Sequence, residues 1–505
     1  MFEPSVAACA HSYDAGQACL VYARLVGDLE TPVSAFLKLS GKRRGGVFLL
    51  ESVEGGAARG RYSMIGLDPD IVLRVFGGKA EINRHALTDA DAFMPYDGPP
   101  LAALRALIAQ SRIEAADGLP PMAAGVFGYL GYDMVRQMER LAEARPDQIG
   151  VADAILLRPT VMVVFDSVRD EIFVVTPLRP EPKVLFRAAY EHAIERLETV
   201  IATLEGLPAH GSYLADPALT ADPPRSNTSK NRFFEMVEKA KDYIRAGDIF
   251  QVVLSQRFSA NFALSAFSLY RALRRINPAP FLCYLDFGSF QIVCSSPEIL
   301  VRVRGGKVTI RPIAGTRWRG KTKAEDEDLA AELLADEKEC AEHLMLLDLG
   351  RNDVGRVAEI GSVAVTEKFA IERYSHVMHI VSNVEGKLGQ AHDVIDALSA
   401  GFPAGTVSGA PKVRAMEIID ELETDKRGIY GGCIGYFGAA GEMDTCIVLR
   451  TAVIRDGKMH VQAGAGIVYD SDPASEQREC ENKAQALFRA AEEAVRFAGK
   501  TKQGQ

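Results

Sequence analysis

Two pairs of glutamates are spaced so that they could do chemistry together: Glu339 with Glu342, and Glu476 with Glu479. Residues three apart project from the same side of a helix, so each pair places two like charges side by side. Two such pairs on two helices could enclose a hard divalent cation, and Mg²⁺ prefers oxygen ligands. A solvated acidic helix face, or glutamates favoured at a helix N-terminus, explains each pair as simply. The residues alone leave both interpretations open.

Several loops rich in glycine and other small residues could hold an anion, because small side chains let backbone N–H groups approach it. These loops are residues 314–316, 403–406, 430–432 and 464–466. Arg450 lies within an apolar segment, residues 446–453, that we expect to form a strand. A buried arginine needs an anionic partner, since an unpaired buried charge is costly. A bound carboxylate would satisfy Arg450, and so would a structural Asp or Glu.

Three further residues could transfer protons. Glu298 follows Pro297 at the end of a strand-like segment, where a turn is the default interpretation. If Glu298 faces a dry pocket, its pKa would rise and it could donate a proton. His376 and His379 lie on one apolar segment, residues 374–382, where a histidine is more often a core residue bonded to a carbonyl. The residue types are therefore compatible with acid–base chemistry without establishing it.

The elements that must position these residues are helices mixed with β-hairpins. Apolar residues recur at helical spacing in residues 185–204, 232–246, 328–349 and 473–497. The buried stripe of the third helix is expected to comprise Leu329, Leu333, Cys340, Leu344 and Leu347. Hairpins are predicted where alternating segments flank Gly or Asp turns, in residues 72–82, 161–176, 301–310 and 453–463. Regular β-α-β alternation is missing, which favours an α+β fold of antiparallel β-sheets packed with outer helices.

A stretch rich in proline and polar residues separates two parts of the chain. It contains four prolines followed by the run Ser-Asn-Thr-Ser, a composition that disfavours both helix and packed strand. We therefore expect a linker at residues 206–228, between an N-terminal α+β domain at residues 1–205 and a C-terminal domain at residues 229–505.

Composition excludes several broad classes of protein. The chain has 505 residues, 48% of them hydrophobic, with 58 Lys and Arg against 67 Asp and Glu. The net charge of −9 argues against a general nucleic-acid binder, which needs a basic face. No apolar run reaches the ~18 residues of a membrane span, and no secretory signal is visible at the start. The eight cysteines are scattered without a C-x-x-C pair, which is typical of reduced thiols in a cytoplasmic protein.

Taken in order, these segments resemble the chorismate-utilising enzymes, and most closely the large aminase component of the anthranilate synthases. The ordered match covers residues 225–500. The strings that carry it are residues 249–256 (IFQVVLSQ), 295–300 (SSPEIL), 312–317 (PIAGTR), 336–353, 373–379 (RYSHVMH), 402–411, 428–432 and 463–468. The N-terminal part matches more thinly, through residues 49–52 (LLES) and 60–63 (GRYS). The resemblance implies a chorismate-binding fold with an N-terminal regulatory and a C-terminal catalytic domain.

The resemblance also implies a reaction, the Mg²⁺-dependent conversion of chorismate and ammonia to anthranilate and pyruvate through 2-amino-2-deoxyisochorismate. This is the first committed step of tryptophan biosynthesis. The implied catalytic residues are Glu298 as general acid, His379 in the loss of pyruvate, and Thr406. The implied substrate-binding residues are Gly315, Thr316, Tyr430, Arg450, Gly464, Ala465, Gly466 and Lys483. The implied metal ligands are Glu339, Glu342, Glu476 and Glu479, and His376 is implied to be a neighbour of the site.

Two positions separate the activities found among such relatives. Isochorismate-forming members carry a lysine where this chain has Gln251, which cannot act as the base that activates water. Aminodeoxychorismate-forming members carry a nucleophilic lysine where this chain has Ala314. Both differences favour anthranilate over isochorismate, salicylate or aminodeoxychorismate. The remaining alternative is a non-catalytic tryptophan sensor on the same scaffold, which would be expected to have lost a catalytic or metal-binding residue.

Two partners are implied besides chorismate. Ammonia would come from a separate glutamine amidotransferase subunit in a hetero-oligomer, because we expect no Gly-x-Cys-x-Gly nucleophile loop in this chain and only 22 residues follow Lys483. L-Tryptophan would be a feedback inhibitor, bound between the two domains. The residues implied for its site are Glu51, Ser52, Pro280, Phe281 and Leu282. Relatives usually read Pro-Tyr-Met at the last three positions, so the tyrosine hydroxyl is lost here.

Overall fold

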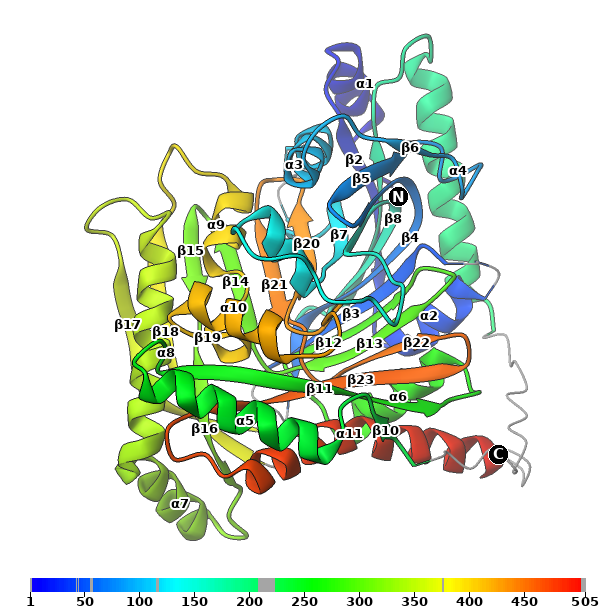
Figure 1. Cartoon of the computed structure of the whole chain (residues 1–505). Helices are drawn as coiled ribbons and strands as arrows, with labels where there is room; N and C mark the ends of the chain where they lie inside the picture. Colours follow the sequence, from blue (N-terminus) through cyan, green and yellow to red (C-terminus); the bar gives the residue numbers. More distant parts are fainter. Residues whose placement is uncertain are drawn as a thin grey trace.

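The protein is built on antiparallel strands that form two sheets with two strands in common. The computed structural model describes residues 2–41, 43, 45–54, 58–114, 118–207, 223–374 and 377–500 (Figure 1). The shared strands are β4 (Ala58–Phe76) and β8 (Ala154–Asp166). Their pairing shifts register between Pro69 and Ile71, so that β8 continues to β9 on one side of the irregularity and to β7 on the other. The two long strands therefore pass from one sheet into the other.

Both sheets follow from the observed strand pairs. The first runs β1 (Phe2–Glu3), β2 (Cys19–Val26), β9 (Glu171–Leu178), β8, β4, β3 (Val47–Glu54), β12 (Phe281–Asp286), β13 (Gln291–Ser296), β22 (Thr451–Arg455), β23 (Lys458–Ile467) and β11 (Gln251–Asn261), with the short β10 (Arg225–Ser226) and β19 (Gly409–Ala410) on β11. The second runs β6 (Phe93–Pro95), β5 (Lys79–Asn83), β4, β8, β7 (Gly125–Leu130), β20 (Cys433–Gly438), β21 (Met443–Ile447), β14 (Ile299–Arg304), β15 (Lys307–Ile310) and β18 (Val377–Lys387), which also pairs with β16 (Ile313–Trp318) and β17 (Ala364–Arg373). All four predicted hairpins and the antiparallel α+β class are confirmed.

Each sheet continues from the N-terminal part of the chain into the C-terminal part. The crossing lies at β3 and β12 in the first sheet and at β7 and β20 in the second. Of the predicted linker at residues 206–228, residues 208–222 lie outside the described part of the chain. The division into two domains stays a prediction.

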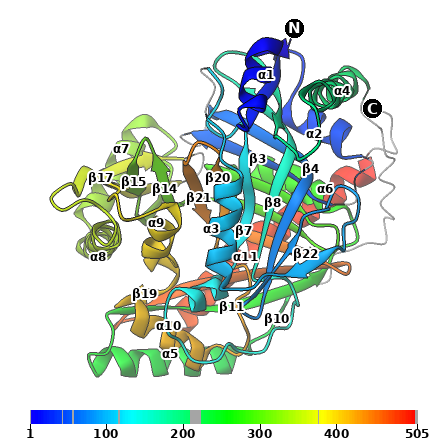
Figure 2. The same ribbon diagram turned by 90° about the horizontal axis from the view of Figure 1, so that it is seen from above.

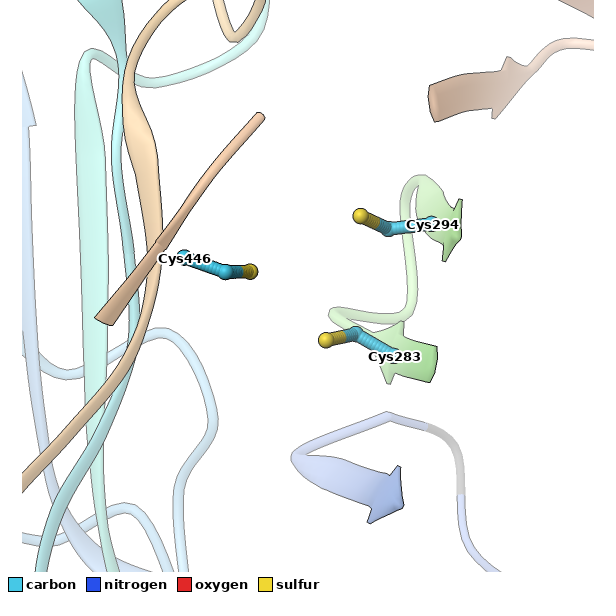
Figure 3. Close-up of side chains that lie close together, drawn as sticks. All are labelled: Cys283, Cys294 and Cys446. Atoms are coloured by element: carbon cyan, nitrogen blue, oxygen red, sulfur yellow. The ribbon is translucent and has the colours of Figure 1, made fainter. Parts of the chain in front are cut away.

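A hydrophobic core fills the space between the two sheets. Phe48 of the first sheet stacks on Phe127 of the second, with ring centroids 4.8 Å apart. Cys283 and Cys294 of the first sheet and Cys446 of the second point toward one another, and their sulfurs all lie within 4.8 Å (Figure 3). The cysteines are thus not scattered in space as in sequence, although all eight are free thiols. Buried thiols pack as small apolar groups here.

Helices cover the outer faces of the sheets. They are α1 (Val6–Asp14), α2 (Pro32–Ser40), α3 (Pro100–Gln110), α4 (Phe186–Glu205), α5 (Lys230–Arg245), α6 (Ala266–Ile276), α7 (Lys323–Ala335), α8 (Glu337–Gly355), α9 (Val394–Gly401), α10 (Lys412–Leu422) and α11 (Pro473–Lys500), with 3₁₀ turns η1 (Tyr132–Gln137) and η2 (Gly405–Val407). Helix α11 packs on β23, α5 and α6, whereas α1 and α4 lie at the opposite end of the molecule from α5 (Figures 1 and 2). In the described part of the chain, no helix has the length and hydropathy that crossing a membrane requires.

The helix predicted at residues 328–349 is in fact two helices. Asp336 ends α7 and caps α8, accepting hydrogen bonds from the backbone N–H groups of Lys338 and Glu339 at 3.1 and 3.2 Å. Because the helix is interrupted at Asp336, the apolar residues of α7 and α8 do not form one continuous buried face. Leu333 and Leu347 are buried as predicted, but Leu344 is 45% exposed.

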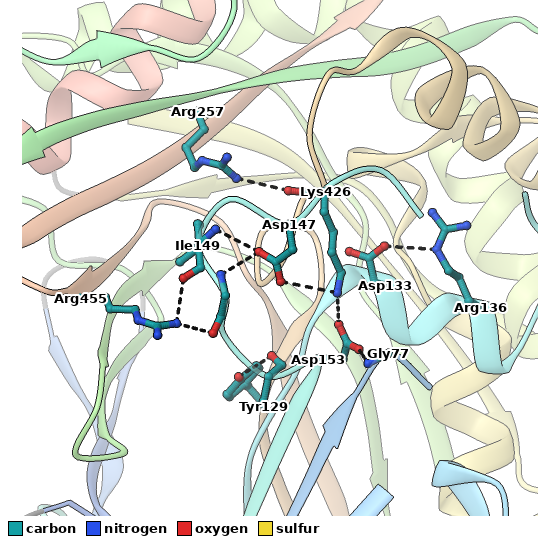
Figure 4. Close-up of polar contacts among 12 residues, drawn as sticks. Gly77, Tyr129, Asp133, Arg136, Asp147, Ile149, Asp153, Arg257, Lys426 and Arg455 are labelled. Atoms are coloured by element: carbon teal, nitrogen blue, oxygen red, sulfur yellow. Dashed lines mark hydrogen bonds and ion pairs between the residues drawn. The ribbon is translucent and has the colours of Figure 1, made fainter. Parts of the chain in front are cut away.

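Ion pairs and hydrogen bonds join the two parts of the chain beside the sheets (Figure 4). Lys426, after α10, forms an ion pair with Asp153, which also accepts from the backbone N–H of Gly77 at 2.8 Å. Arg136 of η1 donates to Asp420 of α10 at 2.7 Å. These contacts hold η1 against α10, and the segment before β8 against the loop that follows α10.

Candidate active site

Strand β23 carries two glycines on one face, which lets two side chains approach its backbone. A methyl group on Gly464 would lie 2.9 Å from Tyr430 Oη, and one on Gly466 would lie 2.5 Å from Gln251 Nε2. Ala465, between them, is fully buried on the other face. The strand therefore forms a flat wall on which only backbone is presented, with Tyr430 and Gln251 resting against it.

Arg450 lies in the connection between β21 and β22, with a φ of 46°, and not on a strand as the sequence predicts. The prediction is wrong because the apolar pattern of residues 446–453 continues through this connection. Burial lowers the pKa of the guanidinium. With the residues that the structure describes, the guanidinium forms neither a hydrogen bond nor an ion pair. A half-buried cation in this state could bind an anionic ligand.

His379 on β18 is held as a neutral base. Its Nδ1 lies 2.8 Å from the carbonyl oxygen of Gly315 and 3.1 Å from Thr316 Oγ1. A carbonyl only accepts, so we assign the proton to Nδ1, which leaves the lone pair on Nε2. Burial lowers the pKa of His379, and the positive charge of Arg450 lowers it further. Tyr374 packs edge-on against the imidazole, with ring centroids 5.5 Å apart.

Glu298 lies between β13 and β14 and is only 6% exposed. Burial raises the pKa of its carboxyl group to about 8. Thr406 Oγ1 donates to Oε1 at 3.4 Å, and this bond and one from the backbone of Ile313 partly oppose the rise. A small cavity of about 30 Å³ adjoins the carboxyl group, lined largely by apolar side chains of α8 and β14. At neutral pH Glu298 is therefore protonated and can donate a proton.

The first glutamate pair, on α8, faces these residues. Glu342 Oε1 accepts a hydrogen bond from Gln251 Nε2 at 3.3 Å. A methyl group on Gly315, whose φ is +65°, would lie 3.2 Å from Glu339 Oε2. Burial raises the pKa of Glu339, and the charge of Glu342 raises it further. Helix α8 thus places both carboxylates beside Gln251 and Gly315.

The second pair lies at the start of α11. Burial raises the pKa of Glu476, and the charge of Glu479 raises it further. A hydrogen bond with Ser471 lowers the pKa of Glu476 in part. Glu479 forms an ion pair with Lys483 at 2.7 Å, and Lys483 Nζ donates to the carbonyl of Gly464 at 3.0 Å. Lys483 therefore links α11 to the wall formed by β23.

The two pairs face a common region around Lys338 of α8. The pKa of Lys338 is raised first by its bond to Asp470, at 3.0 Å, and then by the charges of Glu476 and Glu342. Within the described residues, only the cysteine cluster brings three or more His, Cys, Asp or Glu ligand atoms within 4.8 Å of one another. The glutamates are spaced more widely. Their all-oxygen donor set and the raised pKa values of Glu339 and Glu476 fit a hard divalent cation that keeps water in its shell.

The five residues implied in inhibitor binding gather where β3 pairs with β12. Phe281 lies opposite Ser52 and Leu282 opposite Glu51, while Pro280 immediately precedes β12. The carboxylate of Glu51 is already engaged, accepting from Arg274 Nε at 2.6 Å and from Tyr270 Oη at 2.5 Å. Binding of an inhibitor at this junction stays a prediction.

Sequence comparison relates most of the chain to one protein family. A family model described as "chorismate binding enzyme" matches residues 51–489. The chain belongs to the chorismate binding enzyme family. This chorismate-binding enzyme is 57% identical over 492 residues to anthranilate synthase component 1 from Cereibacter sphaeroides, covering 97% of this chain and 98% of the relative. It is 47% identical over 470 residues to the protein of the same name from Pseudomonas putida, covering 92% and 93%.

Solved structures show the same relationship. Anthranilate synthase component I from Streptococcus pneumoniae superposes with a TM-score of 0.76 at 38% identity, covering 92% of this chorismate-binding enzyme and 99% of that chain. The menaquinone-specific isochorismate synthase from Escherichia coli shares the fold, with a TM-score of 0.69 at 21% identity and coverage of 94% and 95%. The predicted chorismate-utilising fold is thereby confirmed.

Some features of the chorismate-binding enzyme were missed from the sequence, and one expectation needs qualification. His376 lies outside the described residues. Tyr374 has a place in the site that no pattern of residue types indicated. The expectation that no Gly-x-Cys-x-Gly sequence occurs is wrong, because residues 431–435 read Gly-Gly-Cys-Ile-Gly. Cys433 nevertheless lies buried in β20, and burial raises the pKa of its thiol to about 12, so it is not an activated nucleophile.

Proposed function

We propose that this chain is the aminase component of an anthranilate synthase, which converts chorismate and ammonia to anthranilate and pyruvate. The observation that carries the proposal is the half-buried guanidinium of Arg450, which has no anionic partner among the described residues and lies near His379. Chorismate offers two carboxylates. One of them, on the enolpyruvyl group, is assigned to Arg450, with Tyr430 and the backbone of residues 464–466 completing its site.

In the first step ammonia adds at C2 of chorismate as the C4 hydroxyl leaves. The C–N bond forms, the ring double bonds shift, and the C4–O bond breaks. Glu298 supplies the proton with which the hydroxyl departs as water, because its raised pKa keeps it protonated at neutral pH. The added nitrogen gives up a proton in turn. Thr406 orients the acid through its hydrogen bond to Oε1.

In the second step pyruvate is lost and the ring becomes aromatic. A base removes the C2 proton, the C3–O bond breaks, and the leaving enolate takes up a proton to become pyruvate. His379 suits the role of base, because Nδ1–H is committed to Gly315 and Nε2 keeps its lone pair. Its lowered pKa keeps the imidazole neutral near pH 7.

Glu339, Glu342, Glu476 and Glu479 would hold Mg²⁺. Bound there, the metal would neutralise the ring carboxylate of chorismate, which resolves the difficulty of binding a dianion beside four acidic side chains. The raised pKa values of Glu339 and Glu476 support a requirement for a cation. Removal of metal with EDTA should abolish activity, and Mg²⁺ should restore it.

A matched pair of variants tests the metal site. Glu479→Gln should raise the Mg²⁺ concentration needed for half-maximal activity by about tenfold or more. Glu325→Gln, on the exposed start of α7, should leave it unchanged. If the two variants respond alike, the assignment of α11 to the metal site is wrong.

Ammonia is proposed to come from a separate glutamine amidotransferase subunit. The name component 1, carried by the relatives, implies a second component. Gln251 and Ala314 favour amination over the isochorismate and aminodeoxychorismate reactions. Eight free thiols support a cytoplasmic location. L-Tryptophan is proposed as a feedback inhibitor acting at the β3–β12 junction.

The deciding experiment incubates the purified chain with chorismate, Mg²⁺ and ammonium and follows anthranilate fluorescence. Anthranilate and pyruvate should form in equal amounts. Consumption of chorismate to isochorismate, salicylate or aminodeoxychorismate would overturn the assignment, and no consumption at all would favour the non-catalytic alternative. Glutamine should replace ammonium only after a glutaminase subunit is added.

A further inference from the structure

Arg427 lies at the centre of a buried hydrogen-bond network behind Tyr430. Its side chain is 1% exposed and forms a two-pronged pair with Glu423, with Nε 2.9 Å from Oε2 and Nη2 2.6 Å from Oε1. The same Oε1 accepts from the backbone N–H of Ser255 on β11 at 2.7 Å and from its hydroxyl at 2.9 Å. The charge of Arg427 is thus fully compensated, unlike that of Arg450.

The other donors of Arg427 fix two pieces of backbone in the active site. Nη1 donates to the carbonyl of Val407 at 2.7 Å, and Nη2 donates to the carbonyl of Val253 at 2.7 Å. Val407 ends η2 and directly follows Thr406, the residue bonded to Glu298. Val253 lies on β11 opposite Gly466 of β23. One guanidinium therefore ties the Thr406 turn to the glycine wall.

Two aromatic rings lie against the same guanidinium. Its Cζ is 5.6 Å from the ring centroid of Tyr430 and 4.7 Å from that of Tyr132. Tyr132 belongs to η1, before residues 208–222, and its backbone N–H donates to the carbonyl of Gly428 at 2.8 Å. Arg427 thus contacts both parts of the chain at the point where they meet the site.

We propose that Arg427 is a positioning residue of this active site, which sets the relative placement of Thr406, Tyr430 and the β23 wall. The inference rests on the proposed function and extends it to a residue outside the implied substrate, metal and catalytic sets. The role requires arginine, because a lysine ammonium is a point charge that cannot reproduce a planar fork directed at three acceptors. Arg427 acts through its neighbours and not on the reacting atoms.

The test compares Arg427→Lys with Arg257→Lys. Arg257 is also a buried arginine of the same region, but its guanidinium bonds to the carbonyl of Lys426 at 3.2 Å and to Asp425 at 3.1 Å. With chorismate, Mg²⁺ and ammonium, Arg427→Lys should lower kcat by about 10- to 100-fold, as expected for a misplaced catalytic group. Arg257→Lys should stay close to wild type. Equal losses in the two variants would overturn the proposal.

A pH profile separates positioning from a general loss of structure. The bond from Thr406 holds the pKa of Glu298 below the value that burial alone would give. If η2 shifts, this bond weakens and the alkaline limb of kcat moves to higher pH, measured at constant free ammonia. Among the described residues, Tyr374, Asp353 and Lys412 are titratable or charged groups near Glu298, and the substitution leaves them in place. An alkaline limb that does not move would overturn the proposal.

A second variant covers the case in which Arg427→Lys does not fold, as judged by circular dichroism. Glu423→Gln keeps the shape of the pair but weakens its hold on Arg427, so it should shift the alkaline limb in the same direction with a smaller loss of kcat. A folded Glu423→Gln protein with an unshifted limb would contradict the proposal. Failure of the wild-type chain to make anthranilate would instead count against the proposed function.

Discussion

Burial makes Glu298 an acid and at the same time weakens the fold. In an unfolded chain its carboxyl group titrates near 4.5, whereas in the folded protein burial raises the pKa to about 8. Between these two values the folded state binds the proton more tightly than the unfolded state does. The free energy of unfolding therefore falls as pH rises through this window and stays low above it. The active site therefore retains a carboxyl group whose ionisation lowers the free energy of unfolding.

Glu298→Gln should accordingly stabilise the protein at alkaline pH while abolishing anthranilate formation. The gain in the free energy of unfolding should be near zero below pH 4.5 and reach at most about 5 kcal/mol above pH 8. Thermal unfolding at pH 6 and pH 9 measures the difference. Glu327→Gln, on the exposed face of α7, should show no such pH dependence. A gain that is equal at both pH values would show that Glu298 is not a buried acid.

His379→Ala should separate the two steps of the reaction. Removal of the imidazole leaves Glu298 and Thr406 in place, so amination should continue while anthranilate formation falls by about 10²- to 10⁴-fold. Mass spectrometry should then detect accumulating 2-amino-2-deoxyisochorismate as chorismate is consumed. His392→Ala, on the surface, serves as the control. Loss of chorismate consumption in step with loss of anthranilate would refute the separate role of His379.

At the scale of elements, the break between α7 and α8 decides where the first glutamate pair lies. Asp336 caps α8 and forms an ion pair with Arg317 of β16 at 2.8 Å, next to Thr316. Arg317 also contacts Glu339 at 3.4 Å. The cap therefore fixes both the start of the helix and its position against the strand that carries Gly315.

Asp336→Ala should weaken Mg²⁺ binding more than it lowers the stability of the folded protein. Without the cap, the first turn of α8 loses two backbone hydrogen bonds and Glu339 is less well placed. The Mg²⁺ concentration for half-maximal activity should rise by about tenfold, as for the loss of a group that orients a ligand. Thr322→Ala removes the equivalent cap of α7, which carries no implied ligand, and should leave that concentration unchanged. A similar Mg²⁺ response in both variants would contradict the argument.

Elements with local signals could be predicted, whereas those that depend on distant contacts could not. The hairpins at Gly77-Gly78 and Gly305-Gly306 follow from turn residues that tolerate positive φ, and they form as predicted. The contact of Thr406 with Glu298 spans 108 residues and left no local trace. The bend at Arg450 is hidden in an apolar run because tertiary packing overrides strand preference there. Candidate residues were recognisable, but their mutual placement was not.

At the scale of the whole molecule, the two sheets make the N-terminal and C-terminal parts mutually dependent. Each sheet crosses from one part to the other through strand pairs, and the core between the sheets draws on both. Neither part can separate without exposing sheet edges and apolar side chains. We therefore expect one cooperative unfolding transition in calorimetry. The arrangement of the catalytic residues should be lost in the same transition that unfolds β3 and β7.

Lys426→Met tests the polar side of this junction. Lys426 pairs with Asp153 across the two parts, and the side chains are only 11% and 7% exposed. Because the substitution leaves a carboxylate buried without its cation, it should lower the free energy of unfolding by about 3–5 kcal/mol. Lys387→Met removes a surface pair with Glu359 inside one part and should cost less than about 1 kcal/mol. Denaturant unfolding followed by circular dichroism measures the stability of both variants. Equal losses of stability in the two variants, or a second unfolding transition in the wild-type protein, would show that the junction does not couple the two parts.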